Sequence, residues 1–436
     1  MTKLQLSVIS AGASGLCAIK NAINYNCEVI AFEQTNKVGG LWNYTDETER
    51  DEYGLEIHSS MYQNLVTNLP IEIMCYPDEP FRDQKESFVT SNEVLNYYQK
   101  YAEKYELKKY IKFNHHVIRV RPLGNVIMSE VLNSEKWEIM VKNLREDKFE
   151  TFVFDAVLIC SGHFSQSFIP KFKGQMTFKG KQMHSHVYRS SHIFKDERVL
   201  IIGGNNSAVD LIIEATNNSK YATIWSHHLN NKPDLTQFNG RVIEKPDVLK
   251  MTETGVRFTD GSLEECSLIV YATGYLYSYP YLSIDSGVTC NGDYVRPLWM
   301  HCLSINKPTL GFIGLPNLIC PNQMFQLQVE FCLTFMTKRK KLPSKEQMLE
   351  EYELDMLERW KKGLSKRKGH FLGHKAEAQK KYYDELAKKA NIEGIKSCIV
   401  KIHSHAHLNR SKHFTNYRNV KYTIIDENNF IVSPLQ

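Results

Sequence analysis

Three stretches of this chain hold residues whose types and spacing could carry out chemistry. Two are glycine-containing turns, Ser10–Gly15 (S-A-G-A-S-G) and Gly203–Ala208 (G-G-N-N-S-A), and each follows a short apolar run that predicts a buried strand. In such a turn the free N–H groups of the following helix face a pyrophosphate, and glycines let the backbone approach it. The two turns predict two bound dinucleotides. The third stretch lies between them and reads F-x-G-x-x-x-H-x-x-x-Y, with fixed positions Phe178, Gly180, His184 and Tyr188.

The first turn is followed by the acidic residue that a dinucleotide-binding unit requires. Cys27–Phe32 predicts the next strand and ends on Glu33, about 20 residues past the turn, where a carboxylate binds ribose hydroxyls. Ser10 stands where a glycine is usual, and a Cβ there costs about 1 kcal/mol if the backbone is left-handed. The residues expected to bind this nucleotide are Gly12, Ala13, Ser14, Gly15 and Glu33, with Gly40, Leu41 and Trp42 of the loop that follows.

The second turn departs further from the usual pattern. Asn205 occupies the position at which glycine normally admits the pyrophosphate, although asparagine tolerates positive φ and its short side chain can reach a phosphate. The next predicted strand, Ala222–Trp225, ends in S-H-H and not in a carboxylate that would repel a 2′-phosphate. This favours NADPH over NADH, with no arginine there to strengthen the preference. The binding candidates are Gly203, Asn205 and Ser207, together with Thr273 and Gly274 after the predicted strand Leu268–Tyr271.

An amide-rich loop supplies the remaining polar candidates. Tyr62–Pro70 (Y-Q-N-L-V-T-N-L-P) shows little periodicity and is typical of a loop at a cofactor face. Its Asn68 can donate and accept hydrogen bonds without adding charge, and Asn64 is a second cofactor-binding candidate.

Composition narrows the class of protein. The 436 residues include 42% hydrophobic and 24% charged residues and carry a net charge of +5, which is too mild to indicate nucleic-acid binding. The ten cysteines form no C-x-x-C pair or metal-ligand cluster, so a redox disulfide and a zinc site are not expected. His403, His405 and His407 alternate as in a strand, but no carboxylate or cysteine lies nearby and no metal is predicted.

No run reaches the roughly 18 apolar residues of a membrane span, so no integral membrane span is expected. Residues 1–18 superficially resemble a signal peptide, but polar residues interrupt the apolar part, and cleavage would remove the first predicted strand. We therefore expect a cytoplasmic protein, with secretion as the alternative. The sequence leaves the oligomeric state open, a homo-oligomer included.

The elements that must position these residues alternate between strands and helices. Thr90–Tyr105 predicts an amphipathic helix, the runs His116–Val120, Trp137–Val141 and Phe152–Ile159 predict a small strand meander, and Ser344–Gln347 predicts a capping box that opens a later helix. We expect an α/β fold of two Rossmann-like dinucleotide-binding domains, the second inserted into the first. The first would comprise residues 1–165 and 276–436, and the second residues 166–275.

The two turns, the motif between them and Tyr271–Tyr275 (Y-A-T-G-Y) resemble the flavin-containing monooxygenases. The resemblance covers at least residues 4–335 and returns at Gln379–Ala387. The F-x-G-x-x-x-H motif is shared with the Baeyer–Villiger enzymes, which usually carry tryptophan at its end, so Tyr188 favours the amine- and sulfur-oxidising side. The chain looks like the short soluble insect forms, some of which N-oxygenate plant alkaloids.

The resemblance implies FAD on the first domain and NADPH on the second, with His228 near the 2′-phosphate. NADPH would reduce the flavin, O2 would add to give a C4a-hydroperoxyflavin, and one oxygen atom would pass to the nitrogen or sulfur of a small lipophilic amine or sulfide. It implies that Asn68 is catalytic, orienting flavin and nicotinamide, and that His184 and Tyr188 couple the two domains. Two alternatives stay open: an FAD-binding scaffold of little activity, and a Baeyer–Villiger oxygenase acting on ketones.

Overall fold

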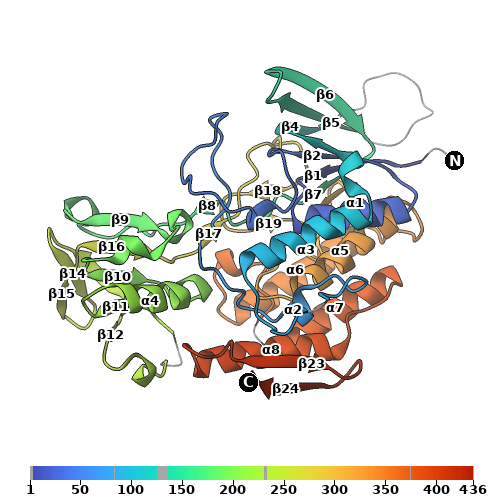
Figure 1. Ribbon diagram of the computed structural model, residues 1–436. Helices are drawn as coiled ribbons and strands as arrows, with labels where there is room; N and C mark the ends of the chain where they lie inside the picture. The colour runs from blue at the N-terminus through green and yellow to red at the C-terminus, as the bar shows by residue number, and fades with distance from the viewer. Residues whose placement is uncertain (1–2, 83, 125–135, 230–232, 374, 436) are drawn as a thin grey trace.

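Two sheets organise the chain, and each forms the centre of one domain (Figure 1): the smaller is parallel, and the larger is parallel except for β20 and β21 at one end. The computed structural model describes residues 3–82, 84–124, 136–229, 233–373 and 375–435. The larger sheet has seven strands in the order β20-β21-β22-β7-β1-β2-β3, and the smaller has five in the order β12-β11-β10-β16-β9. The smaller sheet and its helix stand to the left in Figure 1, and the larger sheet with most of the helices stands to the right.

The larger sheet brings the ends of three strands to one edge. Its strands are β1 (Gln5–Ile9), β2 (Glu28–Glu33), β3 (Ile111–Phe113), β7 (Ala156–Ile159), β20 (Leu298–Trp299), β21 (Leu303–Ser304) and β22 (Leu310–Phe312). The central strand β1 pairs in parallel with β2 and β7, and Ile9 stands opposite both Phe32 and Ile159. Because their carboxyl ends align, Ser10 and Glu33 are placed at the same edge.

Alternation along β1 assigns the two faces of this sheet. Leu6 and Val8 pack with the helices α1 (Ala13–Asn24), α3 (Ser91–Lys104), α5 (Pro321–Met336) and α7 (Ala376–Ala390). Ile9 packs on the other face with Trp137 and Ile139 of a three-stranded antiparallel sheet, β4 (His115–Leu123), β5 (Lys136–Asn143) and β6 (Lys148–Phe154).

The smaller sheet repeats this layering. Its strands are β9 (Lys181–His184), β10 (Val199–Ile202), β11 (Thr223–Ser226), β12 (Val242–Lys245) and β16 (Leu268–Tyr271), all parallel. Val199 and Ile201 pack against α4 (Asn206–Asn218), whereas Leu200 and Ile202 face the antiparallel sheet of β13 (Val248–Met251), β14 (Gly255–Phe258) and β15 (Leu263–Glu265). The fold is therefore α/β with two Rossmann-like domains, the second inserted into the first, as predicted.

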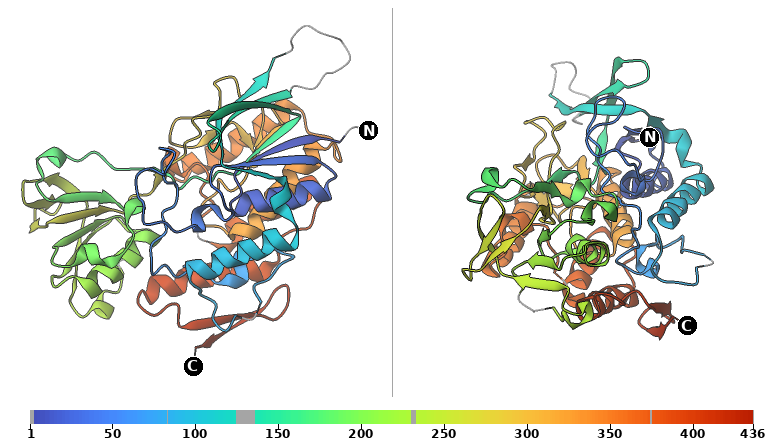
Figure 2. Two further views of the ribbon diagram at one scale, coloured as in Figure 1. Left: turned by 45° about the horizontal axis from the view of Figure 1, so that its top comes forward. Right: turned by 60° about the vertical axis from the view of Figure 1, so that its left-hand side comes forward.

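The segments that enter and leave the second domain pair with each other. β8 (Gln166–Ser167) and β17 (Tyr275–Leu276) form an antiparallel pair in which Gln166 stands opposite Leu276. The left view of Figure 2 shows the green second domain as a lobe beside the first. The predicted domain boundaries fall within the β8–β17 pair and remain a prediction. The other elements are α2 (Ile71–Met74), α6 (Lys345–Lys361), α8 (Ser397–Lys412), β18 (Thr289–Cys290), β19 (Val295–Arg296), β23 (Val420–Ile424) and β24 (Phe430–Pro434).

Two predicted helix starts are confirmed and two strand assignments are wrong. Thr90 and Ser344 each form a capping box at the start of α3 and α6. Phe152–Ile159 is two strands, because the chain leaves the meander after β6 and enters the larger sheet as β7. The histidines at 403–407 lie in α8, since the buried Ile399, Ile402, His403 and Ala406 recur at helical spacing and outweigh the short alternation.

Among the described residues, no helix combines the length and the apolarity that a membrane crossing requires.

Candidate functional site

The first turn packs its helix directly onto its strand. Ser10 adopts φ +89°, so the condition for a strained backbone at this position is met, and Gly12 is the N-cap of α1. A Cβ on Gly15 would lie 2.0 Å from the carbonyl oxygen of Ser10, so only glycine fits there. Ser14 donates to the carbonyl of Cys160 over 3.1 Å and ties the turn to the end of β7.

The serine at position 10 is built into a network around Glu33, which is 2% exposed. One carboxylate oxygen accepts from the Ser10 hydroxyl (3.2 Å) and the Ala11 N–H (2.7 Å). The other accepts from the backbone N–H and hydroxyl of Thr35 (2.9 and 2.8 Å). The Ser10 hydroxyl also accepts from the Gly12 N–H over 3.3 Å. These bonds offset the backbone strain at Ser10 and hold the carboxylate at the edge where a ribose would lie.

The double-glycine loop lies against the first turn. Gly39 donates to the carbonyl of Ala11 over 3.1 Å, and Gly39 and Gly40 have φ values of +112° and +51°. A Cβ on Gly40 would stand 2.9 Å from the Cα of Gly12. Leu41 and Trp42 complete the 3₁₀ turn Gly40–Trp42. The structure therefore brings all eight residues assigned to the first nucleotide to one edge of the larger sheet.

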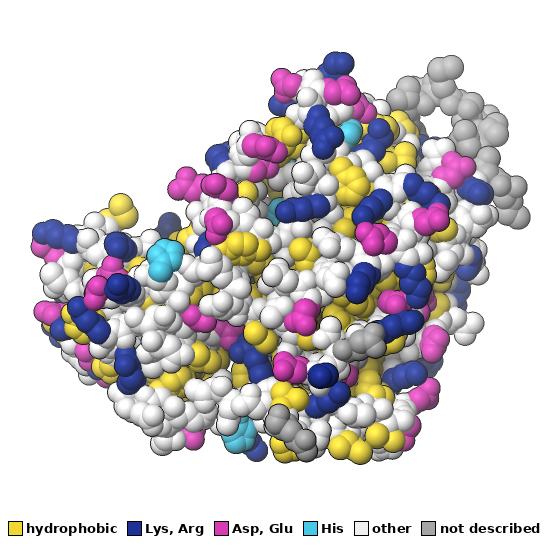
Figure 3. Space-filling model, in the orientation of Figure 1, with side chains coloured by type: hydrophobic (Ala, Val, Ile, Leu, Met, Phe, Trp, Pro, Cys, Tyr) yellow, Lys and Arg dark blue, Asp and Glu magenta, His cyan; other side chains and the backbone are white. Residues whose placement is uncertain are grey.

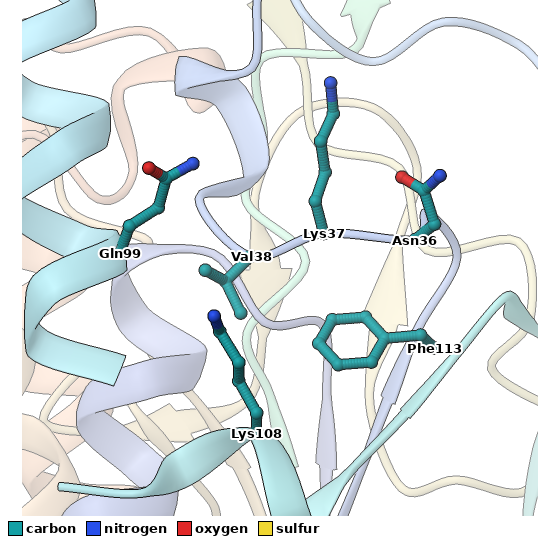
Figure 4. A pocket seen from close by; sticks show the side chains of 6 residues that line it. All are labelled: Asn36, Lys37, Val38, Gln99, Lys108 and Phe113. Atoms are coloured by element: carbon teal, nitrogen blue, oxygen red, sulfur yellow. The ribbon is translucent and has the colours of Figure 1, made fainter. Parts of the chain in front are cut away.

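A cavity of about 180 Å³ opens beyond the carboxyl end of β2 (Figure 4). It is lined by Asn36, Lys37, Val38, Gln99, Lys108 and Phe113. In Figure 4 the side chains of Lys108 and Phe113 point toward Val38. The adenosine end of a dinucleotide on β1 and β2 extends toward this side of a Rossmann sheet. Sequence reasoning missed these residues because they come from three separate segments with no shared motif.

The second turn is also glycine-dependent, but at a different position. Gly203 has φ +130°, and a Cβ there would lie 2.2 Å from the carbonyl oxygen of Ala272. Asn205 is the N-cap of α4 with an extended backbone (φ −93°), so its tolerance of positive φ is not used. Its exposed side chain makes no capping hydrogen bond, and Ser207 beside it is exposed too.

Two residues near the second turn, Trp225 and His228, differ in burial. Trp225 of β11 is buried and donates its indole N–H to the carbonyl of Gly203 over 2.7 Å. His228, beyond the end of β11, is exposed, and its Nδ1 lies 3.3 Å from a carboxylate oxygen of Asp247. The sequence pattern ended at the histidines and did not reveal this acidic neighbour, because Asp247 follows the next strand, β12.

The motif between the turns links the end of β9 to residues 273–274, where the chain leaves the second domain. Gly180 cannot carry a Cβ, which would stand 2.5 Å from the carbonyl oxygen of Ser267 and from the ring of Phe178. The Nδ1 of His184 accepts from the N–H of His186 over 3.1 Å, so its Nε2 carries the proton and donates to the carbonyl of Gly274 over 3.0 Å. Burial lowers the pKa of His184 to about 4 and keeps this imidazole neutral.

Thr273 and Gly274 thus lie where the chain leaves the second domain. The Thr273 hydroxyl donates to the carbonyl of Phe168, and Gly274 has φ +82°. The Ala272 N–H donates to the carbonyl of Ile202 over 2.8 Å, so both residues follow a strand end beside the second turn.

Tyr188 and its neighbour Arg189 join the two domains. Tyr188 is 1% exposed and packs against Tyr62 of the amide-rich loop, with ring centroids 5.2 Å apart. The buried guanidinium of Arg189 donates to five backbone carbonyls, two in its own segment (His186 and Tyr188) and three in the first domain (Thr45, Glu47 and Ser59), over 2.7–3.1 Å. Nothing in the spacing of the motif pointed to Arg189, because carbonyl acceptors leave no sequence signal.

Asn68 lies in a loop whose backbone is held while its own amide is left open. The N–H of Thr67 donates to the carbonyl of Val89 over 2.9 Å, and the guanidinium of Arg418 donates to the carbonyl of Thr67 over 3.0 Å. Within the described part of the chain, the half-buried Asn68 side chain has no hydrogen-bond partner. Asn64 is exposed on the same loop and contributes no hydrogen bond to either turn among the described residues.

No group of three or more histidine, cysteine, aspartate or glutamate side chains in the described ranges is placed to hold a metal ion.

Comparison with known proteins agrees with this geometry. The model of the flavin-binding monooxygenase-like family matches residues 3–229 and 226–422. The chain belongs to this family. FAD and NADPH are the family's cofactors, and its members are monooxygenases.

Relatives of the family oxygenate nitrogen and sulfur. The chain is 32% identical to the senecionine N-oxygenase of Tyria jacobaeae over 80% of this chain and 75% of that protein. It is 33% identical to flavin-containing monooxygenase FMO GS-OX-like 1 of Arabidopsis thaliana, over 84% and 79%. The solved structure of S-allyl-L-cysteine S-oxygenase from Allium sativum superposes with a TM-score of 0.87 at 27% identity, covering 96% of this chain and 95% of that one.

Proposed function

We propose that this flavin monooxygenase uses NADPH and O2 to transfer one oxygen atom to a nucleophilic nitrogen or sulfur of a small lipophilic substrate. The N- and S-oxygenating relatives support this substrate class, and so does the tyrosine that ends the motif at Tyr188. When bound, FAD reduced by NADPH supplies the activated oxygen atom. The protein's own part is to hold the two nucleotides, orient them and exclude water.

The first domain fits FAD. Gly12 and Gly40 lie against each other and present backbone without side chains to a pyrophosphate. No side chain caps the N–H groups at the start of α1, so they can bind that pyrophosphate. The Glu33 carboxylate accepts two bonds at each oxygen from the protein, so a ribose hydroxyl would bind there by displacing one of the two rotatable donors, the hydroxyl of Ser10 or that of Thr35. The residues proposed to hold FAD are Gly12, Ala13, Ser14, Gly15, Glu33, Gly40, Leu41, Trp42 and Asn64.

The second domain, which we place at residues 166–275, fits NADPH. The observation that carries the proposal is the conformation of Asn205: it is extended and exposed at the N-cap of α4, so the departure from glycine leaves the anion-binding end of the helix accessible. This favours an active enzyme over an inert scaffold. Gly203, Asn205, Ser207, Thr273 and Gly274 would hold the nucleotide. His228 would face its 2′-phosphate, with the carboxylate of Asp247 beside the imidazole.

Asn68 is proposed as the catalytic residue. Its amide can donate to one carbonyl and accept from one N–H, so it can orient flavin and nicotinamide together. The N–H and the carbonyl of Thr67 are both hydrogen-bonded, which fixes the backbone next to Asn68. His184 and Tyr188 are proposed to couple the domains through Gly274 and Tyr62.

The test is a product balance on the purified protein. The visible spectrum would first report bound FAD, and NADPH oxidation would then be measured with a panel of tertiary amines and sulfides. N-oxide or S-oxide formed per NADPH, against hydrogen peroxide, is the decisive ratio. A cyclic ketone serves as the matched substrate: lactone from the ketone with no N- or S-oxide would replace the proposal by a Baeyer–Villiger reaction. A colourless protein that takes up no FAD would contradict it altogether.

We also propose a cytoplasmic location, supported by the free state of all ten cysteines, nine of them buried. On the face shown in Figure 3, basic and acidic side chains are interspersed over both domains, and the proposal includes no nucleic-acid partner.

A further inference from the structure

Residues 412–418, here called the bridge, leave the first domain, contact the second and return. The segment begins at the last residue of α8, which packs with α7 and α2, and precedes β23, whose Tyr422 donates its N–H to Ser87 over 2.8 Å. Both flanking elements therefore belong to the first domain. In Figure 1 this red part of the chain reaches toward the green second domain.

The bridge inserts an aromatic ring into the core of the second domain. Phe414 is 6% exposed and meets the ring of Trp225 edge-on, with centroids 6.0 Å apart. The same indole donates to the carbonyl of Gly203 in the second turn. Gln237 adds three polar contacts, donating to the carbonyl of Lys412 over 2.9 Å and accepting from the N–H and the hydroxyl of Thr415 over 3.3 and 3.2 Å. The bridge thus reaches within one side chain of the turn proposed to bind NADPH.

Arg418 links the other end of the bridge to both domains at once. It donates to the carbonyls of Thr67 (3.0 Å) and Val66 (3.1 Å), directly before Asn68. Its guanidinium also pairs over 3.0 Å with Asp210 on α4 of the second domain, and both side chains are largely buried. The second oxygen of Asp210 accepts from the hydroxyl of Tyr62 over 2.7 Å, which closes a circuit back to the loop of Asn68.

We propose that Arg418 is a positioning residue, through which the bridge sets the place of the Asn68 loop relative to the second nucleotide turn. A planar guanidinium suits this role, because one fork can satisfy two carbonyls and a carboxylate at fixed angles. The consequence for the reaction rests on the proposed function. If Asn68 orients the nicotinamide, a shift of its loop relative to the second turn changes their distance, and more of the NADPH consumed then ends as hydrogen peroxide instead of oxygenated product.

The test compares Arg418→Gln with Arg359→Gln. Arg359 pairs over 2.8 Å with Asp355 and donates to a backbone carbonyl, so it matches Arg418 in chemistry but lies wholly within the first domain. Hydrogen–deuterium exchange is followed in peptides spanning residues 64–69. For Arg418→Gln we expect exchange there to rise about 10-fold, as a charge-assisted bond is lost, with no such rise in Arg359→Gln.

Turnover gives the second readout. Arg418→Gln should keep its FAD and the KM for the amine or sulfide, while the share of NADPH that ends as hydrogen peroxide rises about 3-fold or more. Asp210→Asn, which retains the bonds from Arg418 to the carbonyls, should raise the peroxide share without the full change in exchange. This variant also serves if Arg418→Gln fails to fold.

The outcomes separate the two proposals. Exchange does not require turnover, so a wild-type protein that oxygenates nothing would contradict the proposed function while the exchange result still decides the bridge. Equal exchange at residues 64–69 in Arg418→Gln and the wild type, or an equal rise in Arg359→Gln, would overturn the positioning role.

Discussion

The first and second nucleotide turns require glycine at opposite ends of the same six-residue pattern. In the first, the leading position is Ser10 with a left-handed backbone and the closing position must be Gly15. In the second, the leading position must be Gly203 and the closing position is Ala208, fully buried in α4. A Cβ is thus excluded once in each turn, by a carbonyl 2.0 Å away in the first and 2.2 Å away in the second. The difference teaches that the pattern G-x-G-x-x-G records several separate contacts and not one shape.

The turns differ also in what fixes the strand end beside them. The first relies on a buried carboxylate, Glu33, that gathers four donors. The second relies on neutral groups: the indole of Trp225 on Gly203, and the imidazole of His184 on Gly274. The first unit should therefore be sensitive to loss of charge, and the second to gain of charge.

Moving the closing residues between the turns should have the largest effect. Gly15→Ala forces a methyl group into the carbonyl of Ser10 and should destabilise the protein by about 3 kcal/mol or more and abolish FAD binding. The matched change Ala208→Gly should cost only about 1 kcal/mol and spare FAD. Thermal unfolding and flavin absorbance after gel filtration give the measurement. Retention of FAD by Gly15→Ala would show that the first helix can move away from its strand.

Removing the charge of Glu33 should rank next. Glu33→Gln places an N–H₂ group against existing donors, which should cost about 2 kcal/mol and weaken FAD binding. Asp247→Asn is the control at the second strand end, where the carboxylate is exposed; it should change stability by less than about 0.5 kcal/mol. Chemical denaturation and FAD titration compare the pair, and equal effects of the two substitutions would remove the distinction drawn between the strand ends.

Acid should act on the neutral anchor of the second unit. Burial lowers the pKa of His184 to about 4 from the usual 6.5, so the unfolded chain takes up a proton before the folded one does. The unfolded state therefore binds more protons between these values, and stability falls as the pH drops from 6.5 toward 4. In His184→Gln the fall of the unfolding midpoint across this window should be shallower. A slope unchanged by the substitution would assign the effect to other buried histidines, such as His163, whose pKa burial also lowers to about 4.

Restoring the missing glycines should have the smallest effect. Ser10→Gly relieves backbone strain of about 1 kcal/mol but loses a hydrogen bond to Glu33 of similar size, so stability should hardly change. Asn205→Gly has no strain to relieve at φ −93° and no capping bond to lose, and should change stability by a few tenths of a kcal/mol. Unfolding curves and titrations with FAD and NADPH test both. A gain above about 1 kcal/mol in either would show strain beyond that of the backbone angles.

The sequence was sufficient for the parts of the fold that depend on local pattern. Buried strands, glycine turns and capping boxes carry their physical cause in neighbouring residues, and the two-domain α/β fold follows from their order. It was insufficient where the cause is distant. The strand predicted at His403–His407 is a helix because its partners on α7 and α2 bury one helical face. Arg189 and Arg418 bind backbone carbonyls far away in the chain, and such acceptors are present at every residue, so no pattern distinguishes them.

The pairing of β8 with β17 has a consequence for how such a protein can be altered. Gln166 and Leu276 stand opposite each other, so the chain enters and leaves the 109 residues between them at one place. A module attached in this way can be exchanged for another of the same kind without rerouting the host chain. The contacts that a transplant would have to rebuild include the β8–β17 pair, the guanidinium groups of Arg189 and Arg418, and the rings of Tyr188 and Phe414.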